Sequence, residues 1–210
     1  MSAVPGLGKS RVETLADGVF AIAMTLLVLD LRVPQTAPEG LGTALSALLP
    51  RLLSFVLSFA LLGIYWVAHH VQFHYIRRTD RPFLWINILF LLGVAIVPFS
   101  AALLGAYWRE PLAIAVYGAN LMGVAATLLW IWNYATRGRR LVDDALDPEL
   151  VRLGRSRIAF TFAIIGAAVL VSFWQPLLSL ALFLAMIVRF IAPGSVDRFW
   201  TRRAGAGGPP

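Results

Sequence analysis

Apolar residues fill six long runs of the chain, and the short stretches between these runs hold most of the charged residues and prolines. An α-helix rises about 1.5 Å per residue, so runs of this length approach or reach the roughly 30 Å apolar core of a bilayer. We therefore predict an all-α integral membrane protein with six transmembrane helices. The predicted spans are residues 14–31, 45–70, 83–104, 112–134, 158–174 and 177–191.

The first apolar run, within residues 11–33, differs from the others in the spacing of its apolar side chains. One set recurs at steps of three or four residues and consists of Leu15, Gly18, Ile22, Leu26 and Leu29. This spacing gives a narrow stripe, which is typical of a helix that meets similar helices around an axis. We predict that the first helix lines a central pore, with pore-lining residues Ile22, Thr25, Leu26 and Leu29. Thr25 lies about 60° from the stripe and would place its hydroxyl at the pore edge.

Asp17 opens this apolar run and lies about 140° around the helix from Ile22, so its carboxylate is predicted to face neighbouring helices. A carboxylate inside a membrane span is costly and is usually kept for a partner or for a transport pathway. We expect it to pair with Arg11 or with His70 of the second span. The alternative is a capping acid at the headgroup level, where the helix dipole would lower its cost. Asp30, at the other end of the run, is interpreted as an interfacial acid.

Three histidines lie close together at the end of the second span: His69, His70 and His74. His70 and His74 are four residues apart and would share one helix face, as metal-binding pairs do. No cysteine or glutamate accompanies them as a further ligand, so a polar anchor at the membrane interface is the favoured interpretation. We therefore expect no metal ion and no cofactor.

The composition excludes a soluble domain, because 59% of the residues are hydrophobic and 14% are charged. The formal net charge of +7 could indicate a nucleic-acid partner, but the basic residues form short clusters between apolar spans rather than one basic face. We expect a lipid bilayer around the protein and no nucleic acid as a partner. No nucleophile and base lie at a suggestive spacing within the spans, so the sequence does not indicate an enzyme.

The distribution of basic residues predicts the orientation in the membrane. Of the 18 Lys and Arg residues, all but Arg32, Arg51 and Arg109 lie in the N-terminus, in the loops after spans two and four, or in the C-terminal region. The positive-inside rule then places both termini in the cytoplasm of a multi-pass protein of the cell (inner) membrane. The predicted organisation is a disordered segment at residues 1–10, a six-helix channel domain at residues 11–197 and a disordered tail at residues 198–210.

The sequence of residues 17–31 resembles the first-helix signature of the transmembrane protein 175 family of potassium channels. The family motif R-x-x-x-F-S-D corresponds here to Arg11, Leu15, Ala16 and Asp17. Its first and last residues match, and the two residues between them depart from the motif. The resemblance continues at Trp66, His70, Phe73, Asn87, Pro98 and Phe99. It implies a structural polar network of Arg11, Asp17, Trp66, His70 and Asn87.

The resemblance also implies a function. In the family, the isoleucine five residues after the aspartate forms the tightest ring of the pore, and Ile22 occupies that position. Members with one six-helix repeat assemble as homotetramers with their first helices around the axis. The chain is thus expected to be a leak-type channel with a hydrophobic side-chain filter and potassium as the transported ion. The alternative is a small-molecule or proton-coupled carrier, in which Asp17 and His70 would form a proton relay.

Cysteine labelling tests the predicted orientation, because the chain contains no native cysteine and any reaction reports the introduced site. A cysteine at Gly40 or Arg109 should react with an impermeant thiol reagent added outside intact cells, since both positions lie opposite the basic loops. A cysteine at Gly138 should stay unlabelled until the cells are opened. Labelling of Gly138→Cys from outside would contradict the predicted orientation and indicate the opposite one.

Overall fold

The computed structural model describes residues 8–191, and six of its helices are long. They are α1 (Lys9–Leu26), α3 (Leu49–Tyr75), α4 (Arg81–Ala106), α5 (Pro111–Thr136), α6 (Pro148–Ser172) and α7 (Pro176–Ile191). The shorter elements are the 3-10 turns η1 (Leu27–Asp30), η2 (Pro38–Gly40) and η3 (Arg137–Arg139) and the helix α2 (Leu41–Ala47). α1 begins at Lys9, so the last two residues of the segment predicted to be disordered, residues 1–10, are helical. Residues 1–7 and the predicted tail, residues 198–210, lie outside the described residues.

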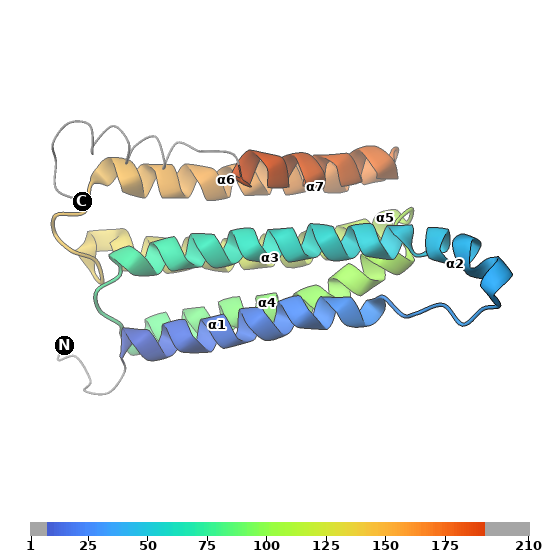
Figure 1. Ribbon diagram of the computed structural model, residues 1–210. Coiled ribbons are helices and arrows are strands. Elements are labelled where there is room, and N and C mark those ends of the chain that lie inside the picture. Colours follow the sequence, from blue (N-terminus) through green and yellow to red (C-terminus); the bar gives the residue numbers. More distant parts are fainter. Residues whose placement is uncertain (1–7, 192–210) are drawn as a thin grey trace, which may run out of the picture.

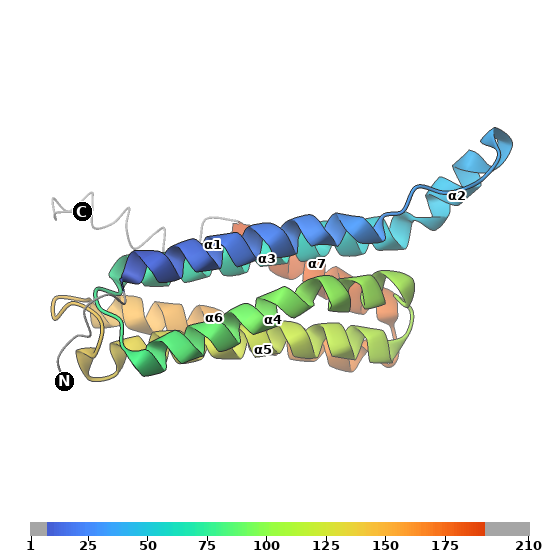
Figure 2. The same ribbon diagram turned by 90° about the horizontal axis from the view of Figure 1, so that it is seen from below.

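The six long helices run in alternating directions along one common axis (Figures 1 and 2). α1 packs on α3 and α4, and α5 packs between α4 and α6. α7 returns against both α6 and α3, which closes the bundle. One end of the bundle therefore collects the start of α1 and the basic connections after α3 and α5, while α2 projects beyond the opposite end (Figure 2).

Five of the six predicted spans correspond to helices that are long and apolar enough to cross a membrane: residues 9–30, 49–75, 81–106, 111–139 and 148–172. The sixth predicted span corresponds to α7, a shorter apolar helix of 16 residues. The all-α membrane fold is confirmed. The count of six spans stays a prediction.

Three boundaries differ from those predicted. The second span is not one continuous helix from residue 45, because the helix is interrupted at Leu48, between α2 and α3. Pro50 occupies the first turn of α3. Proline fits there because a first-turn amide has no helical acceptor to lose. α1 is α-helical only to Leu26 and then tightens into η1. α6 begins at Pro148, ten residues before the predicted fifth span, so the end of the polar segment is part of a long helix.

Aspartate side chains cap the starts of α4 and α6. The carboxylate of Asp80 accepts a hydrogen bond from the amide of Phe83 at 2.9 Å, and that of Asp147 accepts one from Glu149 at 2.8 Å. Each cap satisfies one of the amides that a helix start leaves unpaired. The second carboxylate oxygen of Asp80 accepts a bond from the Tyr134 hydroxyl at 2.8 Å, which ties the start of α4 to α5.

Pro98 interrupts the backbone bonding of α4, and α5 supplies polar groups at this point. The Asn120 amide nitrogen donates to the Gly93 carbonyl at 3.0 Å, and the Ser100 hydroxyl donates to the Asn120 side-chain oxygen at 2.9 Å. A proline inside a membrane helix is tolerated where neighbouring groups satisfy the disturbed backbone. Asn120 of α5 thus supplies the side chain that contacts the α4 backbone near Pro98.

Asn120→Leu should destabilise the bundle by about 1–3 kcal/mol, because it leaves the Gly93 carbonyl and the Ser100 hydroxyl without this partner. The measurement is the unfolding midpoint of the detergent-solubilised protein. Thr127→Ala is the matched control on the same helix, because the Thr127 hydroxyl bonds only to carbonyls of α5, those of Gly123 and Val124. Equal midpoints for the two variants would contradict a bracing role for Asn120.

Candidate pore helix and its polar anchors

α1 has one covered and one uncovered face. The covered face is apolar and consists of Val12, Ala16, Phe20, Ala23 and, on η1, Leu27. It packs against α3 and α4, with the rings of Phe20 and Phe90 centred 5.9 Å apart. The opposite face carries the stripe predicted from spacing: Leu15, Gly18, Ile22, Leu26 and Leu29. Ile22 is 61% exposed and Leu29 is 67% exposed, so a single chain leaves this stripe without a protein partner in its described part.

The end of the stripe lies on the 3-10 turn η1. Side chains three residues apart align along a 3-10 helix, so Leu29 lies nearly above Leu26. The predicted pore-lining residue Thr25 is also exposed, and its hydroxyl donates to the carbonyls of Ala21 and Ile22, both at 2.9 Å. Because the only proton of this hydroxyl is used within α1, lone pairs of its oxygen are what Thr25 can offer to a passing group.

Asp17 is held by Trp66 rather than by either partner expected from the sequence. The Trp66 indole nitrogen donates to the Asp17 carboxylate at 2.8 Å, and the His70 ring stacks on Trp66 with centroids 5.5 Å apart. Within the described chain, Arg11 is exposed and forms no ion pair with Asp17. The expected Asp17–Arg11 or Asp17–His70 pairing is therefore wrong.

The alternative interpretation of Asp17 as a capping acid is also wrong. α1 begins at Lys9, so Asp17 lies two turns inside the helix, and the capping position is occupied by Gly8. The dipole effect falls off within the first turn and gives Asp17 little support. A pocket of about 300 Å³ opens beside it and is lined by Ser10, Glu13, Thr14, Asp17, Trp66, His69, His70 and Phe73.

Asn87 belongs to a separate, buried contact and not to the Asp17 group. Its side-chain oxygen lies 3.1 Å from His69 Nε2, and its nitrogen donates to the Phe83 carbonyl at 2.9 Å. The His69 ring stacks between those of Phe73 and Phe90, at 4.3 and 5.0 Å. The predicted network thus divides into two parts, because neighbouring residues of a helix point about 100° apart. The sequence analysis did not recognise His69 as the buried histidine that contacts Asn87. Only the helical spacing of His69 from Phe73 and Leu62 could have indicated that it is buried.

The histidines do not form a metal site. His69 is buried, while His70 and His74 are exposed, and His74 makes an edge contact with Tyr75. Within residues 8–191, no three His, Cys, Asp or Glu side chains are placed to hold a metal ion.

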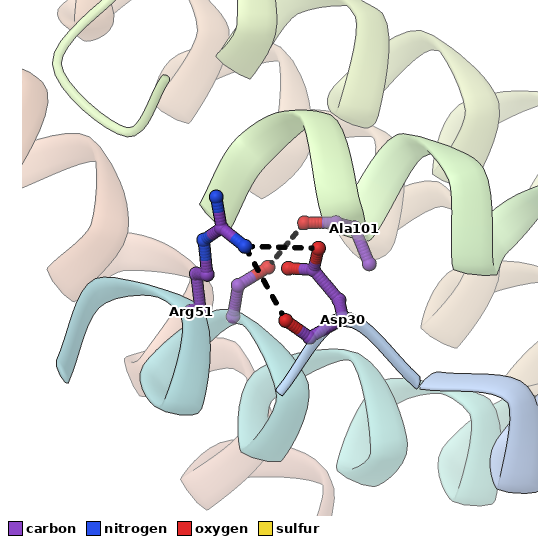
Figure 3. Close-up of polar contacts among 4 residues, drawn as sticks. Asp30, Arg51 and Ala101 are labelled. Atoms are coloured by element: carbon purple, nitrogen blue, oxygen red, sulfur yellow. Dashed lines mark hydrogen bonds and ion pairs between the residues drawn. The ribbon is translucent and has the colours of Figure 1, made fainter. Parts of the chain in front are cut away.

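Asp30 pairs with Arg51, a contact that the sequence analysis missed (Figure 3). The Arg51 guanidinium lies 3.6 Å from the Asp30 carboxylate, and the same nitrogen donates to the Asp30 backbone carbonyl at 3.4 Å. Each residue is a single charge at the edge of an apolar run, without an opposite charge three or four residues away. That isolation was the available signal that the two charges pair across the bundle.

The fold and these contacts define a helical multi-pass membrane protein whose first helix is covered on one face and is held to the bundle at Asp17 and Asp30. The profile of the family described as the endosomal/lysosomal potassium channel TMEM175 matches residues 11–98. A potassium channel of Streptomyces collinus is 42% identical over 156 residues, covering 72% of this chain and 76% of the relative. A potassium channel of Chamaesiphon minutus is 35% identical over 186 residues, covering 86% and 92%.

The fold agrees with these sequence comparisons. The crystal structure of a lysosomal potassium-selective channel TMEM175 homolog from Chamaesiphon minutus superposes with a TM-score of 0.78 at 33% identity, covering 87% of this chain and 96% of that one. The chain belongs to the TMEM175 family. The predicted family membership is confirmed.

Two variants, Trp66→Phe and Asp17→Asn, distinguish the effect of the hydrogen bond to Asp17 from the effect of the Asp17 charge. Trp66→Phe keeps an aromatic ring beside His70 but removes the donor, and it should destabilise the bundle by about 1 kcal/mol at most because the bond is exposed. Asp17→Asn keeps an acceptor for the indole and should cost less. The measurement is thermal unfolding in detergent, with Trp85→Phe, another exposed tryptophan, as the control. A larger loss in Asp17→Asn than in Trp66→Phe would show that the charge and not the hydrogen bond matters.

Proposed function

We propose that this chain forms a potassium-permeable, leak-type channel, a homotetramer in which four α1 helices surround the pore. The observation that carries the proposal is the uncovered apolar stripe on α1, in a chain whose relatives from Streptomyces collinus and Chamaesiphon minutus are named potassium channels. We further propose that it lies in the cell membrane with both termini in the cytoplasm, as its basic connections favour.

An exposed apolar face in a membrane can also face lipid, so the form of the stripe matters. Its residues recur at steps of three or four, which keeps one narrow seam toward an axis. Gly18 lies on this seam, and apart from its chain neighbours and the backbone of its own helix, no described atom lies within 4 Å of where its β-carbon would be. Small residues allow helix backbones to approach closely in membranes, which suits contact between copies of α1.

Ile22 is the proposed narrowest ring of the filter, with Leu26 and Leu29 further along the pore. Four branched apolar side chains offer an ion no oxygen in place of its water, so passage depends on how much hydration fits and on dewetting. The Thr25 oxygen lies at the edge of this ring and is the nearest side-chain acceptor. In this proposal the residues of the predicted polar network do not line the pore but help to hold α1 in place. They are Arg11, Asp17, Trp66, His70 and Asn87.

The carrier alternative required a proton relay between Asp17 and His70. The Asp17 carboxylate instead accepts a hydrogen bond from the Trp66 indole, on which the His70 ring stacks, and an indole nitrogen only donates. The direct contact between Asp17 and His70 that such a relay would use is not formed within the described residues. The geometry therefore favours the channel.

Ile22→Asn tests the proposed filter in liposomes loaded with potassium. The amide should wet the constriction, so total cation flux should rise and discrimination between potassium and sodium should weaken by about tenfold or less, which corresponds to roughly 1.4 kcal/mol in the barrier difference. The measurements are flux rates and the bi-ionic permeability ratio.

Leu170→Asn is the matched control, because Leu170 is an equally exposed apolar residue, at 63%, on α6, which does not pack on α1. Its flux and permeability ratio should equal those of the unaltered protein. If Ile22→Asn also leaves both quantities unchanged, α1 does not line the pathway. If the unaltered protein passes no potassium down a gradient, or does so only with a proton gradient, the channel proposal fails.

A further inference from the structure

The end of α1 is fixed to the bundle by one compact set of contacts (Figure 3). Arg51 of α3 contacts both the carboxylate and the backbone carbonyl of Asp30, the last residue of η1. One turn further along α3, the buried Ser54 hydroxyl donates to the Ala101 carbonyl of α4 at 2.7 Å. η1 is thereby joined to α3 at the point where α3 is joined to α4.

Gly105 of α4 packs directly against both Arg51 and Asp30. A β-carbon at this position would lie 3.1 Å from Arg51 Cα, 3.3 Å from Arg51 Cγ and 3.4 Å from Asp30 Oδ2. The first two distances are tighter than ordinary packing, and the first involves backbone, which cannot turn aside as the tip of a side chain can. The absence of a side chain on Gly105 is therefore what lets Asp30 and Arg51 lie against α4.

The two charges depend on each other because each lies at the unfavourable end of its helix dipole. Asp30 ends η1, where backbone carbonyls already give a negative end, and Arg51 lies in the first turn of α3, where amides give a positive end. Neither charge is explained as a cap of its own helix. Their mutual contact offsets both unfavourable positions.

Leu29, the residue next to Asp30, connects this contact to the proposed pore. Leu29 directly precedes Asp30, and its side chain is 67% exposed on the stripe, while the Asp30 carboxylate is turned toward α3 and α4. Because η1 is a single tight turn, a shift of Asp30 moves Leu29 with it and, one turn below, Leu26.

We propose that the Asp30–Arg51 ion pair, seated on Gly105, is a positioning element that sets how far Leu26 and Leu29 stand from the pore axis and so sets ion discrimination. The inference rests on the proposed function, in which α1 lines the pore. It assigns a role to residues that do not face the ions themselves.

The experiment compares Arg51→Gln, Asp30→Asn and the exchange Asp30→Arg with Arg51→Asp in liposomes. Each single variant should change the potassium-to-sodium permeability ratio by about two- to fivefold, the range that an ion pair of this exposure can supply. The exchange should return the ratio toward that of the unaltered protein, because the swapped charges attract each other and each then lies at the favourable end of its helix. Gly105→Ala, which changes no charge, should move the ratio in the same direction as Arg51→Gln.

Lys9→Gln is the matched control. Lys9 and Glu13 form an ion pair of similar length, 3.7 Å, and similar exposure, but both residues belong to α1, so the pair fixes α1 to nothing. Its loss should leave the permeability ratio unchanged. A variant that only loses stability would yield fewer assembled channels with the ratio of the unaltered protein, so the ratio separates positioning from folding.

The outcomes are distinct from those that test the channel itself. A conducting protein that responds to Ile22→Asn, but whose ratio is unaltered in Asp30→Asn, Arg51→Gln and Gly105→Ala, would overturn the positioning role and leave the proposed function standing. If Arg51→Gln fails to assemble, Asp30→Asn and Gly105→Ala decide in its place, and recovery of assembly in the exchange supports the pair.

Discussion

The first helix is covered along one side only, and the rest of the structure is arranged around that constraint. In a bilayer an uncovered apolar face costs nothing against lipid, so lipid contact alone does not fix where such a helix lies. Its position has to come from contacts on the covered side. Trp66 holds Asp17 in the middle of α1, Phe20 packs on Phe90 about one turn further along, and Arg51 holds Asp30 at the end of η1. Between these two acids, no side chain of α1 or η1 makes a polar contact with another helix in the described structure.

This placement separates support from permeation. The polar contacts that hold α1 and η1 are made by Asp17 and Asp30, while the stretch between them, which is proposed to face ions, is apolar except for Thr25. A polar anchor at the level of Ile22 would have brought an oxygen or nitrogen near the proposed constriction, where partial ion dehydration is sensitive to any such group. The proline-disturbed part of α4 is braced from α5, so this repair lies away from α1.

Much of this was predictable because the bilayer restricts the possible folds. The helix spans and the exposed stripe follow from local patterns that membranes reinforce. Pairings between helices did not follow. Asp17 was matched with charged residues, yet its partner is a neutral tryptophan, and Asn87 was grouped with His70 although its neighbour His69 is the buried one. A one-residue difference changes the direction of a helical side chain by about 100°, which sequence spacing between two different helices cannot resolve.

The two anchors of α1 also differ in kind. At Asp17 the partner is a neutral donor, so the contact is a hydrogen bond and not an ion pair. At Asp30 the partner is a guanidinium at 3.6 Å on a partly exposed surface, so dissolved ions weaken it over a Debye length of about 8 Å at physiological salt. We therefore expect ionic strength to weaken the Asp30 contact more than the Asp17 contact. Because Leu29 directly precedes Asp30 and Ile22 lies closer in the chain to Asp17, we expect salt to act more on the Leu29 end of the proposed filter than on the proposed ring at Ile22.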